Sequence, residues 1–298
     1  MQMDNCTVAA VVVTYNRKYL LRENLQALQA QTRKPDKIIV VDNASTDGTD
    51  KMIEGEFGSD KNIYHLRLPQ NIGGAGGFYE GIKRAYQEGY EWIWLMDDDT
   101  IPAVDALEKL LLAHNRLKSQ GLSVRLLASR VNWVDGTVHP MNMPTINTKN
   151  FDLMFLLTEN GCLPVRNVSF VSMMMHRDLV SKYGLPVKSY FIWNDDVEYT
   201  ARITKNEPGV LVLESVVVHK TKSKHTPVIS SSPDRFYFEV RNKIWMLNKS
   251  QAWNVDEKVK LGVHLFVSVI RYLKMHGLKG GLYVFRGFRD GILKSPQE

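Results

Sequence analysis

The feature that most constrains the fold is a regular alternation of short β-rich runs with helical patterns over the first hundred residues. Such alternation is typical of βαβ units, which build a mostly parallel sheet flanked by helices. Leucines at helical spacing separate the first two runs and end before Pro35. The predicted strands are Val8–Thr14, Lys37–Val41, Ile63–Leu68 and Trp92–Met96. We therefore predict an α/β fold.

Three of these predicted strands end in polar clusters. The clusters are Thr14-Tyr15-Asn16-Arg17, Asp42-Asn43-Ala44-Ser45 and Asp97-Asp98-Asp99. In open parallel sheets, ligands bind beyond the carboxyl ends of the strands. We therefore expect the three clusters to converge on one site.

The chain beyond residue 100 has a less regular pattern. A helix is predicted over Pro102–Lys118, with the proline near its first position. Short strands are predicted at Arg125–Ala128, Val168–Met175 and Val210–Val218. No internal repeat and no low-complexity linker interrupts the chain, so these patterns indicate no domain boundary.

The acidic run Asp97-Asp98-Asp99, which follows the predicted strand Trp92–Met96, is a candidate metal site. If the extended backbone continues, Asp97 and Asp99 point the same way. Two carboxylates on one side suit Mg²⁺ or Mn²⁺, which take one or two carboxylates together with substrate phosphates. The alternative is an acidic loop or a helix cap that leads into Pro102.

A second acidic pair, Asp195 and Asp196, follows the aromatic stretch 190–193 and precedes a helical pattern. A carboxylate at such a corner can act as a general base that takes a proton from a hydroxyl group. The alternative is N-capping and compensation of the helix dipole. One of the two aspartates can cap while the other catalyses.

The glycine-rich stretch 71–78 does not match a dinucleotide-binding motif. The pattern G-x-G-x-x-G begun at Gly74 requires glycine at position 79, which is Tyr79. What remains is a flexible backbone that opens a helix over 80–88 and offers amide donors to a ligand. A tight loop without a ligand is the alternative.

Two further residues are candidates by position. His219 ends the predicted strand at 210–218, where a neutral imidazole could complete the shell of a metal. A lone histidine is more often structural or solvated. Trp193 stands beside the candidate base, where its ring could stack on a sugar.

The composition narrows the class of protein. The formal charge is +6, and residues 256–298 carry eight Lys or Arg against four Asp or Glu. This excess suits an anionic partner such as a membrane surface or a polyphosphate, or it is an ordinary solvated face. Cys6 and Cys162 have neither disulfide-framework nor zinc spacing, which fits a reducing compartment. We expect no signal peptide and no spanning helix, since no apolar stretch approaches roughly 20 residues.

Taken together, the clusters resemble family 2 glycosyltransferases, and more narrowly the bacterial galactofuranosyl- and rhamnosyltransferase-like branch. Five blocks occur in family order over about the first 245 residues. They are VVVTYNR at 11–17, VDNASTD at 41–47, NIGGAGGF at 71–78, WLMDDD at 94–99 and FIWNDDVEY at 191–199. The run RFYFEVRN at 235–242 also resembles the branch.

The resemblance implies roles for individual residues. Asp97 and Asp99 would carry the metal-binding D-x-D role, with His219 as a further ligand. Asp98 would face the donor sugar, and Asp42 would face the nucleotide base. Asp196 would be the catalytic base. In relatives the tryptophan often stands directly before the aspartates, whereas here Asn194 separates Trp193 from them. Asp195 therefore remains a candidate for the base. The other residues implied in donor binding are Thr14, Tyr15, Arg17, Asn43, Asn71, Gly73, Gly74, Ala75, Gly76 and Trp193.

The resemblance also implies a fold and a reaction. The fold is GT-A, over residues 1–245, with a C-terminal helical extension over 246–298. The reaction is inverting and uses Mn²⁺ or Mg²⁺. UDP-galactofuranose is the leading donor because the Gly-Gly-Ala-Gly-Gly stretch is typical of galactofuranose users, and dTDP-rhamnose is the alternative. The acceptor would be a glycan or a polyprenyl-phosphate-linked glycan in the synthesis of cell-surface polysaccharide.

The extension is predicted to form a basic amphipathic helix. Its apolar positions Val259, Val263, Phe266, Val267 and Ile270 fall at helical spacing among lysines and arginines. Such a helix can lie in an anionic membrane interface or pack on the catalytic domain. We expect a cytoplasmic protein, peripheral at the inner face of the membrane if the first alternative holds.

Two other classes of protein are alternatives to a glycosyltransferase. A nucleotidyltransferase requires a basic glycine-rich loop after the first strand, where this chain has Thr14-Tyr15-Asn16-Arg17. A non-enzymatic lipid- or nucleic-acid-binding module would use the positive tail and not the acidic run. We expect no nucleic-acid partner, and the sequence predicts no oligomeric state.

Overall fold

The computed structural model describes residues 6–296, and within them ten strands form one sheet. The strand order is β3-β2-β1-β4-β9-β6-β10-β8-β7, with β5 paired to β10. The strands are β1 (Val8–Thr14), β2 (Lys37–Asp42), β3 (Ile63–Arg67), β4 (Trp92–Asp97), β5 (Thr100–Pro102), β6 (Leu126–Asn132), β7 (Thr145–Ile146), β8 (Cys162–Asn167), β9 (Met173–His176) and β10 (Gly209–His219). The helices are α1 (Lys18–Gln29), α2 (Thr49–Phe57), α3 (Gly73–Gln87), α4 (Ala106–Ser119), α5 (Phe151–Glu159), α6 (Asp178–Tyr183), α7 (Asp195–Thr204), α8 (Pro233–Asn248) and α9 (Val255–Leu293).

Strands β3, β2, β1 and β4 are parallel and correspond closely to the four predicted strands. Every residue of β1 is buried, because helices cover both faces of the sheet. Side chains alternate along the strand, so Val8, Ala10 and Val12 join one core while Ala9 and its odd-numbered neighbours join the other. The predicted α/β class with a mostly parallel sheet is confirmed.

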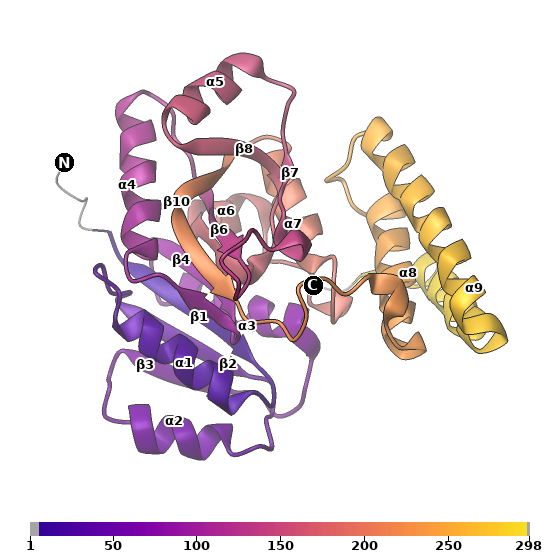
Figure 1. Cartoon of the computed structure of the whole chain (residues 1–298), viewed down its shortest axis with the longest axis horizontal. Helices are drawn as coiled ribbons and strands as arrows, with labels where there is room; N and C mark the ends of the chain where they lie inside the picture. The colour runs from indigo at the N-terminus through magenta and orange to yellow at the C-terminus, as the bar shows by residue number, and fades with distance from the viewer. Residues whose placement is uncertain (1–5, 297–298) are drawn as a thin grey trace.

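The helices form two layers around this sheet (Figure 1). Residues of α1, α2, α4 and α5 pack with the first core. Residues of α3, α6 and α7 pack with the second core, on the opposite face. Both layers are therefore anchored by apolar contacts, and the carboxyl ends of the central strands are left for polar side chains.

Two predicted elements differ from the structure. The predicted helix at 102–118 begins only at Ala106, because Thr100–Pro102 forms β5 and pairs with the end of β10. The predicted strand at 168–175 is a 3-10 helix at Phe170–Ser172 followed by β9, which lies antiparallel between β4 and β6. Both differences arise from pairing with strands distant in sequence.

Helix α3 begins at Gly73, so the predicted flexible loop before residue 80 is wrong. The glycines allow the helix to approach the sheet closely. A Cβ atom at Gly77 would lie 2.5 Å from Val13 Cγ1, and one at Gly81 would lie 2.3 Å from Val11 Cγ1. The glycine-rich stretch is therefore mainly a helix that packs tightly against β1.

Helices α8 and α9 lie together at the side of the molecule away from α4 (Figure 1). Helix α9 is two helices joined at Gly277, whose φ is 57°. Both halves contact α8 through an apolar cluster in which Phe236 stacks on Tyr272, with ring centroids 3.6 Å apart. Residue 245, the end of the predicted catalytic domain, lies inside α8. No helix within residues 6–296 combines the length and apolar character needed to span a bilayer.

Candidate active site

The strand register aligns the polar ends of three parallel strands. Thr14 pairs with Asp42 across β1 and β2, and Val13 pairs with Asp97 across β1 and β4. The hydroxyl of Thr14 donates to Asp98 Oδ2 at 2.7 Å. The predicted clusters thus meet at one edge of the sheet.

The acidic run does not continue the extended backbone, so the condition on which Asp97 and Asp99 would point the same way is not met. Strand β4 ends at Asp97, and a turn at Asp98 and Asp99 leads into β5. The turn is required because β5 runs antiparallel to β10, with Thr100 opposite His219. Asp97 and Asp99 still converge, but the turn and the β10 pairing bring them together.

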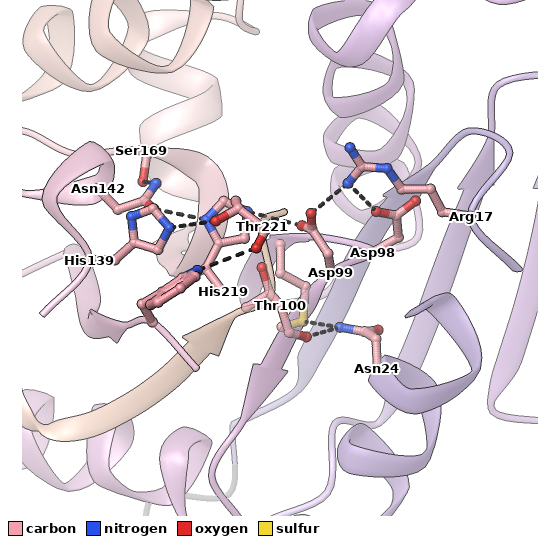
Figure 2. Close-up of polar contacts among 12 residues, drawn as sticks. Arg17, Asn24, Asp98, Asp99, Thr100, His139, Asn142, Ser169, His219 and Thr221 are labelled. Atoms are coloured by element: carbon pink, nitrogen blue, oxygen red, sulfur yellow. Dashed lines mark hydrogen bonds and ion pairs between the residues drawn. The ribbon is translucent and has the colours of Figure 1, made fainter. Parts of the chain in front are cut away.

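His219 reaches Asp99 through this pairing. Its Nε2 lies 3.0 Å from Asp99 Oδ1, and its Nδ1 lies 2.8 Å from Asn142 Oδ1 (Figure 2). Because the asparagine oxygen can only accept, Nδ1 carries the proton and Nε2 faces Asp99. Asn142 itself donates to Ser169 Oγ at 3.1 Å, which fixes the amide. No sequence motif marks Asn142, which is the last residue of a short 3-10 helix, Pro140–Asn142.

The donor set fits a divalent cation. Ligand atoms of Asp97, Asp99 and His219 all lie within 4.8 Å of one another. Asp99 Oδ1 is buried and accepts no hydrogen bond of ordinary geometry, although it lies 3.0 Å from His219 Nε2, itself a candidate ligand. A buried carboxylate oxygen without a donor is costly unless a cation satisfies it. Two hard oxygens and one imidazole nitrogen match the preferences of Mn²⁺ and suit Mg²⁺ through the carboxylates.

Arg17 lies on the other side of the acidic run. Its guanidinium is 3.3 Å from Asp98 Oδ1 and 2.5 Å from Asp99 Oδ2, so Figure 2 shows Asp99 between Arg17 and His219. Burial would raise the pKa of Asp99, but His219 and Arg17 outweigh it and lower the pKa. Burial raises the pKa of Asp97 to about 6, assisted by Asp99, and that of Asp98 to about 7. This concentration of carboxylates in a buried place favours cation binding.

Asp42 is fully buried and bonded within the protein. Ser45 N donates to its Oδ1 at 2.8 Å, and His65 Nε2 lies 3.3 Å from its Oδ2. Burial would raise the pKa of Asp42, but His65 and Ser45 lower it below the usual value. Asp42 therefore stays ionised and orders the turn after β2. Its contact with a nucleotide base remains a prediction.

The start of α3 is tied to the turn after β2. The amide of Asn43 accepts from Ile72 N at 3.4 Å and donates to the carbonyl of Gly73 at 3.3 Å, and Asn71 Oδ1 accepts from Gly73 N at 2.8 Å. A Cβ atom added at Gly74 would have no other atom within 4 Å, whereas Ala75 is buried against Tyr190 and Trp245. Of these residues, Gly74 therefore has room beside it for a ligand.

Gly73 also touches the segment before α7. A Cβ atom at Gly73 would lie 2.0 Å from the carbonyl oxygen of Phe191, and Ala75 N donates to the same oxygen at 3.3 Å. Gly76 packs against Ile72 on the same turn. The candidate donor segment and the candidate base segment are therefore neighbours in space.

Asp195 and Asp196 occupy the first turn of α7, whose N-cap is Asn194. Asp195 is buried, and Asp196 is half-buried with main-chain hydrogen bonds from Val197 (2.7 Å) and Phe170. Burial raises the pKa of Asp196 to about 6, and burial together with the charge of Asp196 raises the pKa of Asp195 well above its usual value. The charge of Asp196 also raises the pKa of Asp97, so the two acidic groups share one electrostatic environment.

The remaining predicted residues lie at the rim of this site. Tyr15 is exposed, and Trp193 is half-buried beneath the guanidinium of Arg235, 5.5 Å from its ring centroid. The arrangement as a whole combines a candidate cation site, a carboxylate of raised pKa, an exposed tyrosine and a half-buried tryptophan. It can bind an anionic leaving group and accept a proton, which is the chemistry of group transfer to a hydroxyl.

Comparison with known proteins identifies the class. The sequence model of Glycosyl transferase family 2 matches residues 9–184, which is more than half of the chain. The chain therefore belongs to glycosyl transferase family 2, and it is a glycosyltransferase, as the sequence blocks predicted.

Two curated relatives are similar over most of the chain. The galactofuranosyltransferase GlfT1 of Mycolicibacterium smegmatis is 30% identical over 204 residues, which cover 67% of this chain and 66% of that protein. The galactofuranosyltransferase GlfT1 of Mycobacterium tuberculosis is 27% identical over 253 residues, which cover 82% of this chain and 83% of that protein. The chain is thus related to the galactofuranosyltransferase type.

Solved structures share the fold. S. aureus TarS 1–349 in complex with UDP-GlcNAc has a TM-score of 0.64 and 16% identity, over 97% of this chain and 82% of that one. A longer TarS structure has a TM-score of 0.65 and 16% identity over 96% of this chain, which spans 48% of it. GalNAc-T7 with UDP, GalNAc and Mn²⁺ has a TM-score of 0.61 and 14% identity, over 87% of this chain and 55% of that one. The predicted GT-A fold is confirmed.

Proposed function

We propose that this glycosyltransferase is metal-dependent and inverting, and that it moves galactofuranose from UDP-galactofuranose to a hydroxyl of a glycan or lipid-linked acceptor. The observation that carries the proposal is the convergence of Asp97, Asp99 and His219. The donor is supported by the two relatives named as galactofuranosyltransferases and by structural neighbours that hold UDP or UDP-GlcNAc.

The cation would be held by Asp97, Asp99 and His219. When bound, Mn²⁺ or Mg²⁺ neutralises the negative charge that develops on the departing diphosphate. Asn142 keeps Nε2 of His219 directed at Asp99, and Arg17 adds a positive charge beside the same carboxylates. With the cation held there, the site would present positive charge to the leaving group.

Asp196 is the proposed base. Its carboxylate, oriented by the main-chain donors Val197 and Phe170, takes the proton of the acceptor hydroxyl. The acceptor oxygen then bonds to the anomeric carbon while the bond from that carbon to the diphosphate oxygen breaks on the opposite face. The configuration inverts, and no covalent intermediate with the protein forms.

The acceptor is proposed to enter beside α8. A pocket of about 430 Å³ lies between α8 and the second half of α9. Aromatic faces stack on sugar rings, and arginine and aspartate side chains bond to hydroxyl groups. Phe238 in this pocket stacks on Phe191, 5.0 Å between centroids, which links the pocket to the segment before Asp196. The lining residues are Asp234, Tyr237, Phe238, Tyr283, Arg286, Arg289 and Asp290.

The outer face of α9 is proposed to contact an anionic membrane surface. The apolar positions noted in the sequence point outward, with Val259 61% and Phe266 66% exposed. A different set, Leu265, Val269 and Tyr272, packs against α8. The outer stripe is flanked by lysines and arginines, as in helices that lie in an interface. A lipid-linked acceptor would be presented at such a surface.

The test is a donor panel. The protein is incubated with Mn²⁺ and UDP- or dTDP-sugars, with and without a lipid-linked acceptor, and nucleotide diphosphate release is measured. We expect release from UDP-galactofuranose, and a loss of about 10³-fold or more in Asp97→Ala and Asp99→Ala. Asp152→Ala, an exposed aspartate at the start of α5, is the matched control and should retain full activity.

Three results would count against the proposal. Release only from dTDP-rhamnose would replace the donor. Full activity in chelator-treated protein would remove the cation from the mechanism. No release from any donor would remove the proposed reaction.

A further inference from the structure

The segment that leads into Asp195 and Asp196 has an unusual backbone. Within this segment, which we call the base loop (Tyr190–Asn194), Phe191, Trp193 and Asn194 have φ values of 66°, 63° and 68°. Residues with side chains seldom adopt this left-handed region, and they do so only where surrounding contacts hold them. The base loop therefore requires an external support.

Asn242 on α8 supplies that support. Its Nδ2 lies 3.1 Å from the carbonyl oxygen of Tyr190, 2.9 Å from that of Ile192 and 2.9 Å from that of Trp193. Asn242 is fully buried. One amide group therefore donates, with its two hydrogens shared, to three carbonyls of the base loop.

Arg241 fixes the orientation of that amide. Its Nε and Nη2 donate to Asn242 Oδ1 at 3.0 and 2.8 Å, which directs Nδ2 at the base loop. Arg241 Nη2 also donates to the carbonyls of Ser189 (2.7 Å) and Tyr190 (2.9 Å). A charged donor to a main-chain oxygen is a strong hydrogen bond, so the two residues act as one unit.

A second contact holds the last residue of the base loop. Asn194 Nδ2 donates to Glu239 Oε2 at 2.9 Å, one turn before Asn242 on α8. Glu239 is paired with Lys243, whose Nζ lies 3.0 Å from His264 Nδ1 on α9. The support therefore extends from α9 through α8 to the residue directly before Asp195.

We propose that Asn242 is a positioning residue that holds the base loop in its strained conformation and thereby sets the place of the Asp196 carboxylate. The inference rests on the proposed function of Asp196. It makes α8, and α9 behind it, part of the catalytic machinery. If α8 served only to attach a C-terminal extension, Asn242 would not need to bond to three carbonyls of the base loop.

The test separates transfer from donor binding. In Asn242→Ala, the three carbonyls lose their donor without gaining a charge. We expect kcat for transfer to fall about 10²-fold, the range of a misplaced general base, while the Kd for UDP with Mn²⁺, measured by calorimetry, changes by no more than about twofold. Retained UDP binding and an unchanged circular dichroism spectrum also demonstrate that the variant is folded. Asn248→Ala, an exposed asparagine at the end of the same helix, is the control.

A milder variant covers the case in which Asn242→Ala does not fold. Asn194→Ala removes the half-exposed side chain that donates to Glu239, and at a φ of 68° alanine also adds strain to the same loop. It should lower kcat in the same direction with UDP binding intact. An unchanged kcat in Asn194→Ala, if Asn242→Ala is unfolded, overturns the inference.

A double-mutant cycle decides whether Asn242 acts through Asp196. If it does, the double variant Asp196→Asn, Asn242→Ala has the same kcat for transfer as Asp196→Asn alone. Multiplying effects, a full kcat in Asn242→Ala, or a loss of UDP binding in proportion to kcat would overturn the inference. If transfer in Asp196→Asn is as fast as in the native chain, the proposed base is wrong and the inference fails with it. If transfer is lost in Asp196→Asn but normal in Asn242→Ala, only the inference fails.

Discussion

At the residue scale, the neighbours of the acidic run decide what each aspartate can do. Asp98 accepts from Thr14 and Arg17 and is buried, whereas Asp97 and Asp99 face His219. The three consecutive carboxylates are therefore not equivalent. The predicted contact of Asp98 with a donor sugar stays a prediction, since Thr14 and Arg17 already bond to its two oxygens.

The contact between Asn142 and His219 leads to a prediction about cation affinity. Asn142→Ala removes the acceptor that keeps the proton on Nδ1, so Nε2 is less well directed at the cation. We expect the Mn²⁺ concentration for half-maximal activity to rise about 10–100-fold, with the rate largely restored at saturating Mn²⁺. Titration of activity with Mn²⁺ measures it, with Asn206→Ala, an exposed asparagine, as the control. An unchanged midpoint would indicate that Asn142 has no part in holding His219.

At the element scale, the glycines of α3 determine how closely this helix lies on β1. The helix brings its first turn beside both Asn43 and Phe191, so its distance from the sheet also sets the spacing of the donor side and the base loop. A helix of ordinary residues would be held farther away. Tight packing here therefore serves both stability and the site.

Two glycine substitutions should have opposite effects on stability. Gly81→Ala places a Cβ atom 2.3 Å from Val11 Cγ1 and 3.1 Å from Val41 Cγ2, and overpacking outweighs the gain in helix propensity. We expect a loss of about 1–2 kcal/mol in the free energy of unfolding. In Gly55→Ala on α2, nothing lies within 4 Å, so we expect a gain of about 0.5–1 kcal/mol. Urea denaturation measures both, and the same sign for both would contradict the packing argument.

At the scale of the whole molecule, α8 joins the base loop of the α/β sheet domain to helix α9. Helix α8 contacts the base loop on one side and both halves of α9 on the other. The exposed stripe of α9 is thereby connected to the base loop through α8. A membrane surface bound there would hold its lipid-linked molecules near the same loop.

The proposed membrane contact can be tested with vesicles. A triple variant, Val259→Ser, Val263→Ser and Phe266→Ser, removes exposed apolar area without touching the contacts with α8. We expect co-sedimentation with vesicles of phosphatidylcholine and phosphatidylglycerol to weaken at least about tenfold, and binding of the native chain to weaken with salt.

The control for this experiment is a matched triple variant outside α9. Val104→Ser, Val134→Ser and Met143→Ser change equally exposed apolar residues outside α9. This variant should bind vesicles like the native chain. Equal loss in both variants, or no binding by the native chain, would refute a specific role for α9.

The sequence by itself determined the parallel half of the sheet, the polar clusters at its strand ends and the family. These features are local. A run of apolar residues indicates a buried strand, and the spacing of apolar residues indicates a helix. A polar residue after the run indicates where the strand ends. The meeting of Thr14, Asp42 and Asp97 then follows from the geometry of any parallel sheet.

Only the tertiary structure decided the contacts that complete the site. The turn at Asp98 and Asp99 depends on the pairing of β5 with β10, and the orientation of His219 depends on Asn142, 77 residues away. The support of the base loop depends on Asn242, about 50 residues beyond it. Such contacts join residues that are distant along the chain and leave no period or motif in the sequence. They exist because a buried carbonyl, carboxylate or imidazole must find a partner wherever the folded chain places one.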